Sequence, residues 1–441
     1  MPDPRSSPVQ LRRAVASSFL GSVIEYYDFL LYATASAVVF DRVFFTNLDP
    51  LVATVASFGT FATGYLARPL GGLVFGHFGD RVGRKRMLVL TMVLMGVASS
   101  LIGLLPTYQQ IGAWAPVGLV ALRIVQGIAV GGEWGGAVLM SAEHATTRRG
   151  LWASFTNAGA PCGMLLSTAV LTGSAAVFGE DAFLDWGWRV PFLLSVALLV
   201  LGLFVRLKVA EPRLFEEVRE SGAPRRTPVI EVLRDRPRQL ALGVGVGLSA
   251  FVAQSTLTTF VLAYGVQAGF GRQTVLNAIT LSSACAVVGI IAWSALSDRV
   301  GRRPVVLAGA VAMAAYSFAL FPMVDSGSGA LLVLALVLGQ GVLHPMMYGP
   351  LAALYTELFS TRSRYTGASL GYQLAGLGGG LAPVLFAQLR SAGAGTAAIS
   401  GTITAFCALT AVCVVALQET SRSDLAAASR TGTAAEKEGK L

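Results

Sequence analysis

Long apolar runs separated by short charged segments set the pattern of this chain. A helix that crosses the hydrocarbon core of a bilayer needs about 20 mostly apolar residues, and twelve runs reach that length. They predict helices at 16–40, 51–75, 87–105, 116–141, 151–178, 187–207, 239–265, 273–296, 304–324, 329–355, 365–389 and 393–417. The pattern therefore predicts an all-α membrane protein with twelve transmembrane helices.

A charged strip, GHFGDRVGRKR at 76–86, separates the second predicted helix from the third. It is too short for a soluble domain, and its glycines permit a close reversal of the backbone, so we expect a tight turn. A weaker copy, SDRVGRR at 297–303, separates the eighth helix from the ninth. Such duplication is common in secondary transporters and predicts two similar six-helix halves.

The predicted units follow from this repeat. They are an N-terminal half at 1–207, a cytoplasmic connector at 208–238, a C-terminal half at 239–417 and a tail at 418–441 that we expect to be disordered.

Composition supports a membrane protein. Hydrophobic residues make up 54% of the chain and charged residues 13%, about half the charged share of soluble proteins. Most of the 33 lysines and arginines fall in loops and tails that would share one side, which predicts cytoplasmic termini and explains the positive net charge without nucleic acid. The four cysteines lie in apolar segments without a CxxC pair, so we expect no disulfide, metal or cofactor.

Ionisable side chains inside a membrane are costly and usually mark function. The candidates lie in four of the predicted helices: Glu25 with Asp28, Arg68, Arg123 with Glu133, and His344. Glu25 and Asp28 are three residues apart and therefore share one helix face.

Arg123 lies at a depth similar to that of the acidic pair. At 1.5 Å per residue, Asp28 is about 18 Å from the cytoplasmic end of its helix and Arg123 about 10 Å from the outer end of its own, in a core about 30 Å thick. The planar guanidinium of arginine suits a carboxylate, and a buried acid can exchange a proton as nearby charges change. These residues therefore indicate a site for an anion and a proton. Structural ion pairs are the alternative, and are our interpretation of Arg68 and Glu133.

Other polar groups could complete such a site. His344 has an ordinary pKa near physiological pH and could relay a proton, although a buried neutral histidine is the alternative. Gln126, Gln254 and Tyr348 are polar side chains in apolar runs that could orient a ligand.

Several segments together resemble the metabolite–proton symporter branch of the major facilitator superfamily. They are IEYYDF from Ile24, RPLGG from Arg68, GGEWGG at 131–136, DWGWRVPF at 185–192 and the two charged strips. That branch includes transporters for shikimate, 2-oxoglutarate, citrate, and proline with betaine.

The resemblance implies that helices 1, 4, 7 and 10 line a central cavity. It also implies that the two strips gate the cytoplasmic side, through Gly79, Asp80, Arg81, Gly83, Arg84, Asp298, Arg299, Gly301 and Arg302.

We therefore expect a monomeric, proton-coupled importer of a small organic acid such as shikimate, in the cytoplasmic membrane of a bacterium. Arg123 would bind the carboxylate, helped by Gln126, Gln254 and Tyr348, and the proton would be carried by Glu25, Asp28 or His344. A transporter of a zwitterionic osmolyte such as betaine or proline is one alternative, and a non-transporting receptor of the same fold is another. The sequence contains no plausible catalytic constellation, so an enzyme is not expected.

Overall fold

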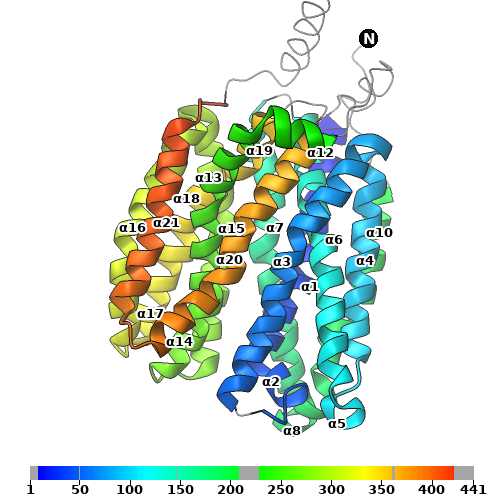
Figure 1. Cartoon of the computed structure of the whole chain (residues 1–441), viewed down its shortest axis with the longest axis vertical. Coiled ribbons are helices and arrows are strands. Elements are labelled where there is room, and N and C mark those ends of the chain that lie inside the picture. The colour runs from blue at the N-terminus through cyan, green and yellow to red at the C-terminus, as the bar shows by residue number, and fades with distance from the viewer. Residues whose placement is uncertain (1–7, 49, 146, 208–227, 360–362, 422–441) are drawn as a thin grey trace, which may run out of the picture.

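In a computed structural model, long helices run side by side through the whole molecule (Figure 1). The structure describes residues 8–48, 50–145, 147–207, 228–359 and 363–421, and these residues contain no β-strand. The predicted all-α fold of twelve spanning helices is confirmed, and each expected helix is present within several residues of its predicted bounds.

The N-terminal half holds six spans. They are α1 (Pro8–Val38), α3 (Pro50–Val82), α4 (Arg84–Leu104), α6 (Trp114–His144), α7 (Arg149–Phe178) and a run that comprises a π-helical segment (Phe183–Gly187), α9 (Arg189–Leu193) and α10 (Ser195–Leu207). The short helices α2 (Phe40–Val43), α5 (Tyr108–Ile111) and α8 (Glu180–Ala182) connect them.

The C-terminal half holds the other six, after α12 (Pro228–Ile230) and a π-helical turn (Glu231–Asp235). The seventh span joins α13 (Pro237–Ser255), a π-helical segment (Thr256–Phe260) and α14 (Val261–Gln267). Single helices form the eighth and ninth spans, α15 (Arg272–Val300) and α16 (Arg302–Asp325). The tenth joins α17 (Gly329–Leu336), a π-helical segment (Val337–Leu343), α18 (His344–Tyr348) and α19 (Leu351–Leu358). The last two are α20 (Arg364–Ser391) and α21 (Thr396–Ala416).

Ten helices within the described residues are long and apolar enough to cross a membrane. Two more, α1 and α3, have 31 and 33 residues and are long enough, but they bury Glu25, Asp28 and Arg68. The sides of the bundle expose large apolar side chains such as Val200, Val288 and Val412, as lipid-facing surfaces require. The polar exceptions to this pattern are therefore inside the bundle.

One end of the bundle carries α12 and the N-terminal end of α1, and lies at the top in Figure 1. We call it the basic face because it carries Arg81, Lys85, Arg86, Arg299 and Arg303.

The two halves pack together along α3 with α20 and along α7 with α15. A Cβ atom at Gly76 would lie 2.9 Å from the Cα of Thr366, and one at Gly79 would lie 2.1 Å from the ring of Tyr365. These two glycines therefore allow α20 to approach α3 at the basic face. Within the N-terminal half, a Cβ atom at Gly131 would lie 2.0 Å from the backbone oxygen of Arg68. This glycine therefore lets α6 pack against α3.

The expected tight turn at 76–86 is wrong in its extent. Helix α3 continues through Asp80 to Val82 and α4 begins at Arg84, so Gly83 alone reverses the chain. Its φ of 123° and the φ of 103° at Gly301 in the second strip are positive, a region that glycine enters without a Cβ clash. Gly76 and Gly79 serve helix packing instead.

Parts of the predicted connector and tail lie outside the described residues, namely 208–227 and 422–441. The rest of the connector includes α12, and Glu231 beyond it accepts a hydrogen bond from Ser363 at 2.9 Å. The first residues after α21 are also fixed, because Glu419 accepts hydrogen bonds from the backbone N–H groups of Arg302 and Arg303 at 2.9 and 3.1 Å.

Candidate functional site

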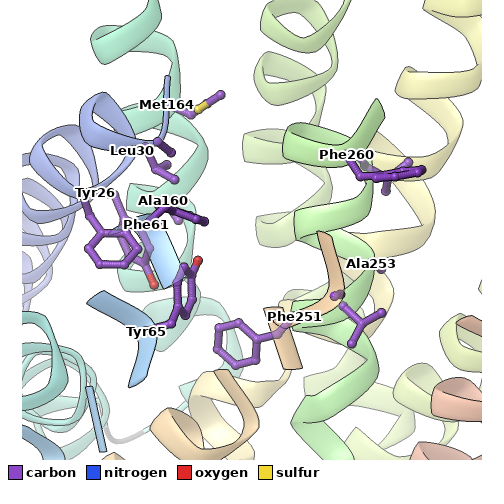
Figure 2. Close-up of a cluster of buried hydrophobic side chains, with 14 of the residues drawn as sticks. Tyr26, Leu30, Phe61, Tyr65, Ala160, Met164, Phe251, Ala253 and Phe260 are labelled. Atoms are coloured by element: carbon purple, nitrogen blue, oxygen red, sulfur yellow. The ribbon is translucent and has the colours of Figure 1, made fainter. Parts of the chain in front are cut away.

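A pocket lies between the two halves. The N-terminal half lines it with Leu30 of α1 and with Ala160, Pro161 and Met164 of α7. Across it, the C-terminal half contributes Gln254, Thr258, Ala286, Ile290, Gln340, His344 and Tyr348. The space among them is about 350 Å³, including its open side. Figure 2 shows Leu30, Ala160 and Met164 on one side, facing Phe251, Ala253 and Phe260 on the other.

The polar wall of the pocket comes from irregular parts of two helices. Thr258 belongs to the π-helical segment of the seventh span, and Gln340 belongs to that of the tenth, just before His344. Such segments are rare and occur frequently at functional sites. The tenth span is broken again at Gly349 and Pro350, where a turn separates α18 from α19.

His344 is 3% exposed, and neither ring nitrogen has a hydrogen-bond partner among the described residues. Its ring stacks on that of Tyr348, with centroids 5.1 Å apart and 21° between the planes. By contrast, the amide of Gln340 donates to Ser283 at 3.1 Å. Buried polar groups in native proteins nearly always have partners, so the unpartnered His344 is available to a ligand in the pocket.

Three tyrosine hydroxyls meet beside this pocket. The hydroxyl of Tyr372 lies 2.8 Å from that of Tyr26 and 2.6 Å from that of Tyr348. The indole of Trp134 stacks on Tyr372 and donates to Asn157 at 2.9 Å, and Asn157 donates to the backbone oxygen of Tyr348 at 2.8 Å. These contacts join the halves near the level of the pocket. This cluster was not predicted from the sequence, because aromatic residues in membrane helices are common.

Arg123 and Gln126 lie within the N-terminal half and are not among the residues that line the pocket. The guanidinium of Arg123 donates to Gln126 at 3.0 Å and lies 3.9 Å from the ring centroid of Phe29 and 4.2 Å from that of Tyr32. Gln126 in turn donates to Ser99 at 2.7 Å. The Nε and Nη2 atoms of Arg123 have no hydrogen-bond partner among the described residues.

The acidic side chains do not pair with Arg123 in the described structure. Asp28 is fully buried and accepts a hydrogen bond from Ser195 on α10. Glu25 is 2% exposed, and neither of its carboxylate oxygens has a hydrogen-bond partner among the described residues. The two acids of α1 therefore occupy different surroundings.

Arg206 of α10 forms a buried ion pair with Glu133 of α6. No role for Arg206 was predicted from the sequence, since basic residues are expected at the cytoplasmic end of a spanning helix. Its position one residue inside the predicted helix 187–207 was the available signal.

Arg68 bridges the two halves. Its Nε donates to the side-chain oxygen of Gln373 on α20 at 2.8 Å, and the amide of Gln373 donates to the backbone oxygen of Gly131 at 3.1 Å. These bonds, with the ion pair of Glu133, agree with the interpretation of Arg68 and Glu133 as structural charges.

The two charged strips make equivalent contacts at the basic face. Asp80 accepts hydrogen bonds from the backbone N–H and the hydroxyl of Thr366, at 3.1 and 2.8 Å, in the first turn of α20. Asp298 accepts from the backbone N–H groups of Gly150 and Leu151, at 2.8 and 2.9 Å, in the first turn of α7. Each strip therefore fixes the first turn of a helix in the other half, where a carboxylate is favoured by the helix dipole.

The remaining predicted gating residues differ in their contacts. Arg302 pairs with Asp298 at 2.8 Å and with Glu357 at 3.2 Å. Arg81 lies 3.3 Å from the ring nitrogen of His77, and Arg299 is exposed. The side chain of Arg84 lies outside what the structure describes.

The chemistry available is binding and proton exchange. Within the described residues, no group of three His, Cys, Asp or Glu side chains could hold a metal ion.

Comparison with known proteins places the chain among transporters. Residues 18–383 and 279–433 match the Major Facilitator Superfamily. The chain is 39% identical to the shikimate transporter of Escherichia coli (strain K12) over 420 residues, 93% of this chain and 95% of that protein. It is 32% identical to the proline/betaine transporter of the same organism over 399 residues, 86% of this chain and 78% of that protein.

The fold is similar to that of the solved proton:xylose symporter XylE bound to 6-bromo-6-deoxy-D-glucose. The TM-score is 0.71 at 18% identity, with 92% of this chain and 95% of that chain covered.

Proposed function

Because this chain belongs to the major facilitator superfamily, we propose that it imports a small organic acid together with protons by alternating access. Membership of the family makes it a multi-pass membrane protein and a secondary transporter, not an enzyme. The proposed membrane is the inner membrane of a bacterium, since the matched relatives are bacterial transporters. Shikimate or a related carboxylate is the proposed substrate, since the shikimate transporter of Escherichia coli is 39% identical.

The pocket between the halves carries this proposal. Hydrogen bonds between the halves occur at the level of Tyr26 and Tyr372 and continue to Asp80 and Thr366 at the basic face. The positive-inside rule assigns the basic face to the cytoplasm. With the two halves joined at the basic face, the transporter would receive substrate from the opposite side of the membrane. Opening of the basic face would then release the substrate.

The substrate's polar groups would meet Gln254, Thr258, His344 and Tyr348 in the pocket. Arg123 remains the predicted carboxylate ligand, with two guanidinium nitrogens to offer. Since Phe29 and Tyr32 now cover its guanidinium, α1 and α6 would have to move for it to reach a substrate.

A zwitterionic osmolyte is the second candidate. The pocket lining includes no lysine or arginine, and a quaternary ammonium is attracted to aromatic faces such as that of Tyr348. The 32% identity to the proline/betaine transporter also supports a zwitterionic osmolyte as the substrate.

Uptake into proteoliposomes tests the proposal. Purified protein is reconstituted with an acidic exterior and offered labelled shikimate, other carboxylates, betaine or proline. We expect a carboxylate to accumulate, and a protonophore to abolish its accumulation. Binding without flux would indicate a receptor, and accumulation of betaine without any carboxylate would favour the second candidate.

A further inference from the structure

We infer that Glu25 holds the coupling proton, and that Arg68, once freed from Gln373 by opening of the basic face, is the cation that replaces this proton. The inference rests on the proposed proton-coupled transport and names the residues that connect the proton to the gate.

Glu25 lacks a partner although charged groups surround it. The titratable side chains near enough to act on it electrostatically are Glu133 on α6, Arg68 on α3 and Arg206 on α10. Helix α7 also packs against α1 and places no charge beside it at Gly159 and Gly163, which lie against the α1 backbone at residues 22–23 and 26–27. Both oxygens of Glu25 are nevertheless without a hydrogen bond within the described residues.

Arg206 already forms an ion pair with another carboxylate, that of Glu133. Its guanidinium crosses α1 at Gly21, where a Cβ atom would lie 2.1 Å from Nη2, and pairs with Glu133. An isolated carboxylate charge in a buried site costs many kcal/mol, whereas the neutral acid costs far less. In this state, the site therefore accommodates Glu25 as the neutral acid.

Arg68 is engaged in a hydrogen bond that crosses the halves. Its Nε donates to Gln373, its guanidinium carbon lies 5.0 Å from the ring centroid of Tyr65, and its Nη2 has no hydrogen-bond partner among the described residues. The bond can exist only while α3 and α20 lie together, as they do here.

Opening of the basic face would part α3 from α20 and break this bond together with that between Asp80 and Thr366. The guanidinium carbon of Arg68 lies 5.1 Å from the ring centroid of Phe29, which is one helical turn from Glu25 on the same face of α1. The freed guanidinium would therefore turn to Glu25. The O–H bond of Glu25 would break, the proton would pass to water at the open basic face, and the carboxylate would keep the electron pair in an ion pair with Arg68. Proton release would thereby follow the opening of the gate.

Asp28 does not have these connections. Its hydrogen bond runs to Ser195 within the N-terminal half, so rearrangement between the halves leaves it in place. The structure thus distinguishes two acids that the sequence placed on one face.

Counterflow and gradient-driven uptake in proteoliposomes test the inference. In Glu25→Gln, we expect exchange of labelled for unlabelled substrate to persist while accumulation under a pH gradient falls to simple equilibration. Substrate affinity should also lose its pH dependence, which a merely structural defect would not cause. Asp185→Asn, an exposed acid outside the bundle interior, is the matched control and should behave as wild type.

Two variants of Gln373 provide an independent test should Glu25→Gln fail to fold. Gln373→Leu frees Arg68 in every state, so the ratio of protons to substrate should fall while exchange continues. Gln373→Glu would hold Arg68 by charge and should slow exchange. Gradient-driven accumulation that persists in Glu25→Gln, or a proton ratio unchanged in Gln373→Leu, would overturn the inference. Lack of gradient-driven uptake in wild type would instead refute the proposed function.

Discussion

The ring of Trp134 in the N-terminal half stacks on the ring of Tyr372 in the C-terminal half, with centroids 3.5 Å apart and planes 7° apart. Tyr372 in turn holds the hydroxyls of Tyr26 and Tyr348. These contacts connect four helices beside the pocket, namely α1, α6, α18 and α20.

Trp134→Leu should weaken the association of the halves on the basic side of the pocket. Loss of an aromatic pair costs about 1 kcal/mol beyond the buried area, which shifts the population toward an open basic face. Cysteine labelling at the basic face should increase several-fold. Trp134→Phe keeps an aromatic ring for the stack but loses the N–H that donates to Asn157. It should therefore label less than Trp134→Leu, and equal labelling would contradict the role of the stack.

Asp80→Asn should impair the transport cycle more than substrate binding. The carboxylate contacts the first turn of α20 at Thr366, and its charge at a helix N-terminus is worth about 0.3–2 kcal/mol. We expect reduced uptake and greater labelling of the basic face, with a nearly unchanged dissociation constant. A collapse of equilibrium binding with unaltered labelling would refute the gating role.

Arg123→Lys tests the predicted carboxylate ligand. Lysine keeps the charge but loses the planar guanidinium, so uptake should be lost or strongly weakened while expression remains intact. The stacking on Phe29 and Tyr32 predicts an additional stability loss of about 1 kcal/mol, seen as a lower Tm. Wild-type uptake with unchanged apparent affinity, accompanied by a lower Tm, would leave Arg123 a structural role only.

Gly21→Ala should destabilise the protein. The new methyl group would occupy the space of the Arg206 guanidinium, so the ion pair between Arg206 and Glu133 would have to shift or separate while both charges stay buried. Gly59→Ala on α3 is the control, since a Cβ atom there meets nothing within 4 Å. Thermal unfolding of both variants should show a lower Tm for Gly21→Ala alone.

Glu419→Gln should remove a pH-dependent contribution to stability. Desolvation opposes ionisation of Glu419, but hydrogen bonds from the backbone N–H groups of Arg302, Ser421 and Arg303 outweigh it and lower its pKa below 4.5. A carboxyl with a lowered pKa stabilises the folded state above the pKa of the unfolded chain and loses this effect as pH falls through the folded value. The Tm difference between wild type and variant should therefore be present near neutral pH and shrink below about pH 4.5; a constant difference would contradict the assignment.

The spanning helices could be predicted from the sequence by itself. Bilayer thickness fixes the length of each apolar run, and backbone hydrogen bonds must be satisfied inside the segment. The helix predicted at 273–296, for example, is Arg272–Val300 in the structure. The buried charges Glu25, Asp28, Arg68 and Arg123 were equally visible, because any ionisable residue contrasts with an apolar run.

The partners of these buried charges were decided only by the tertiary structure. Periodicity gives the face of a helix that carries Glu25 but not which helix packs against that face, so depth alone suggested Arg123 as the partner of the acids. In the structure, Arg123 donates to Gln126, Arg206 takes Glu133, and Arg68 reaches across to Gln373. Side chains from distant parts of the chain meet according to helix rotation and close packing at glycines such as Gly21, and those depend on the whole bundle.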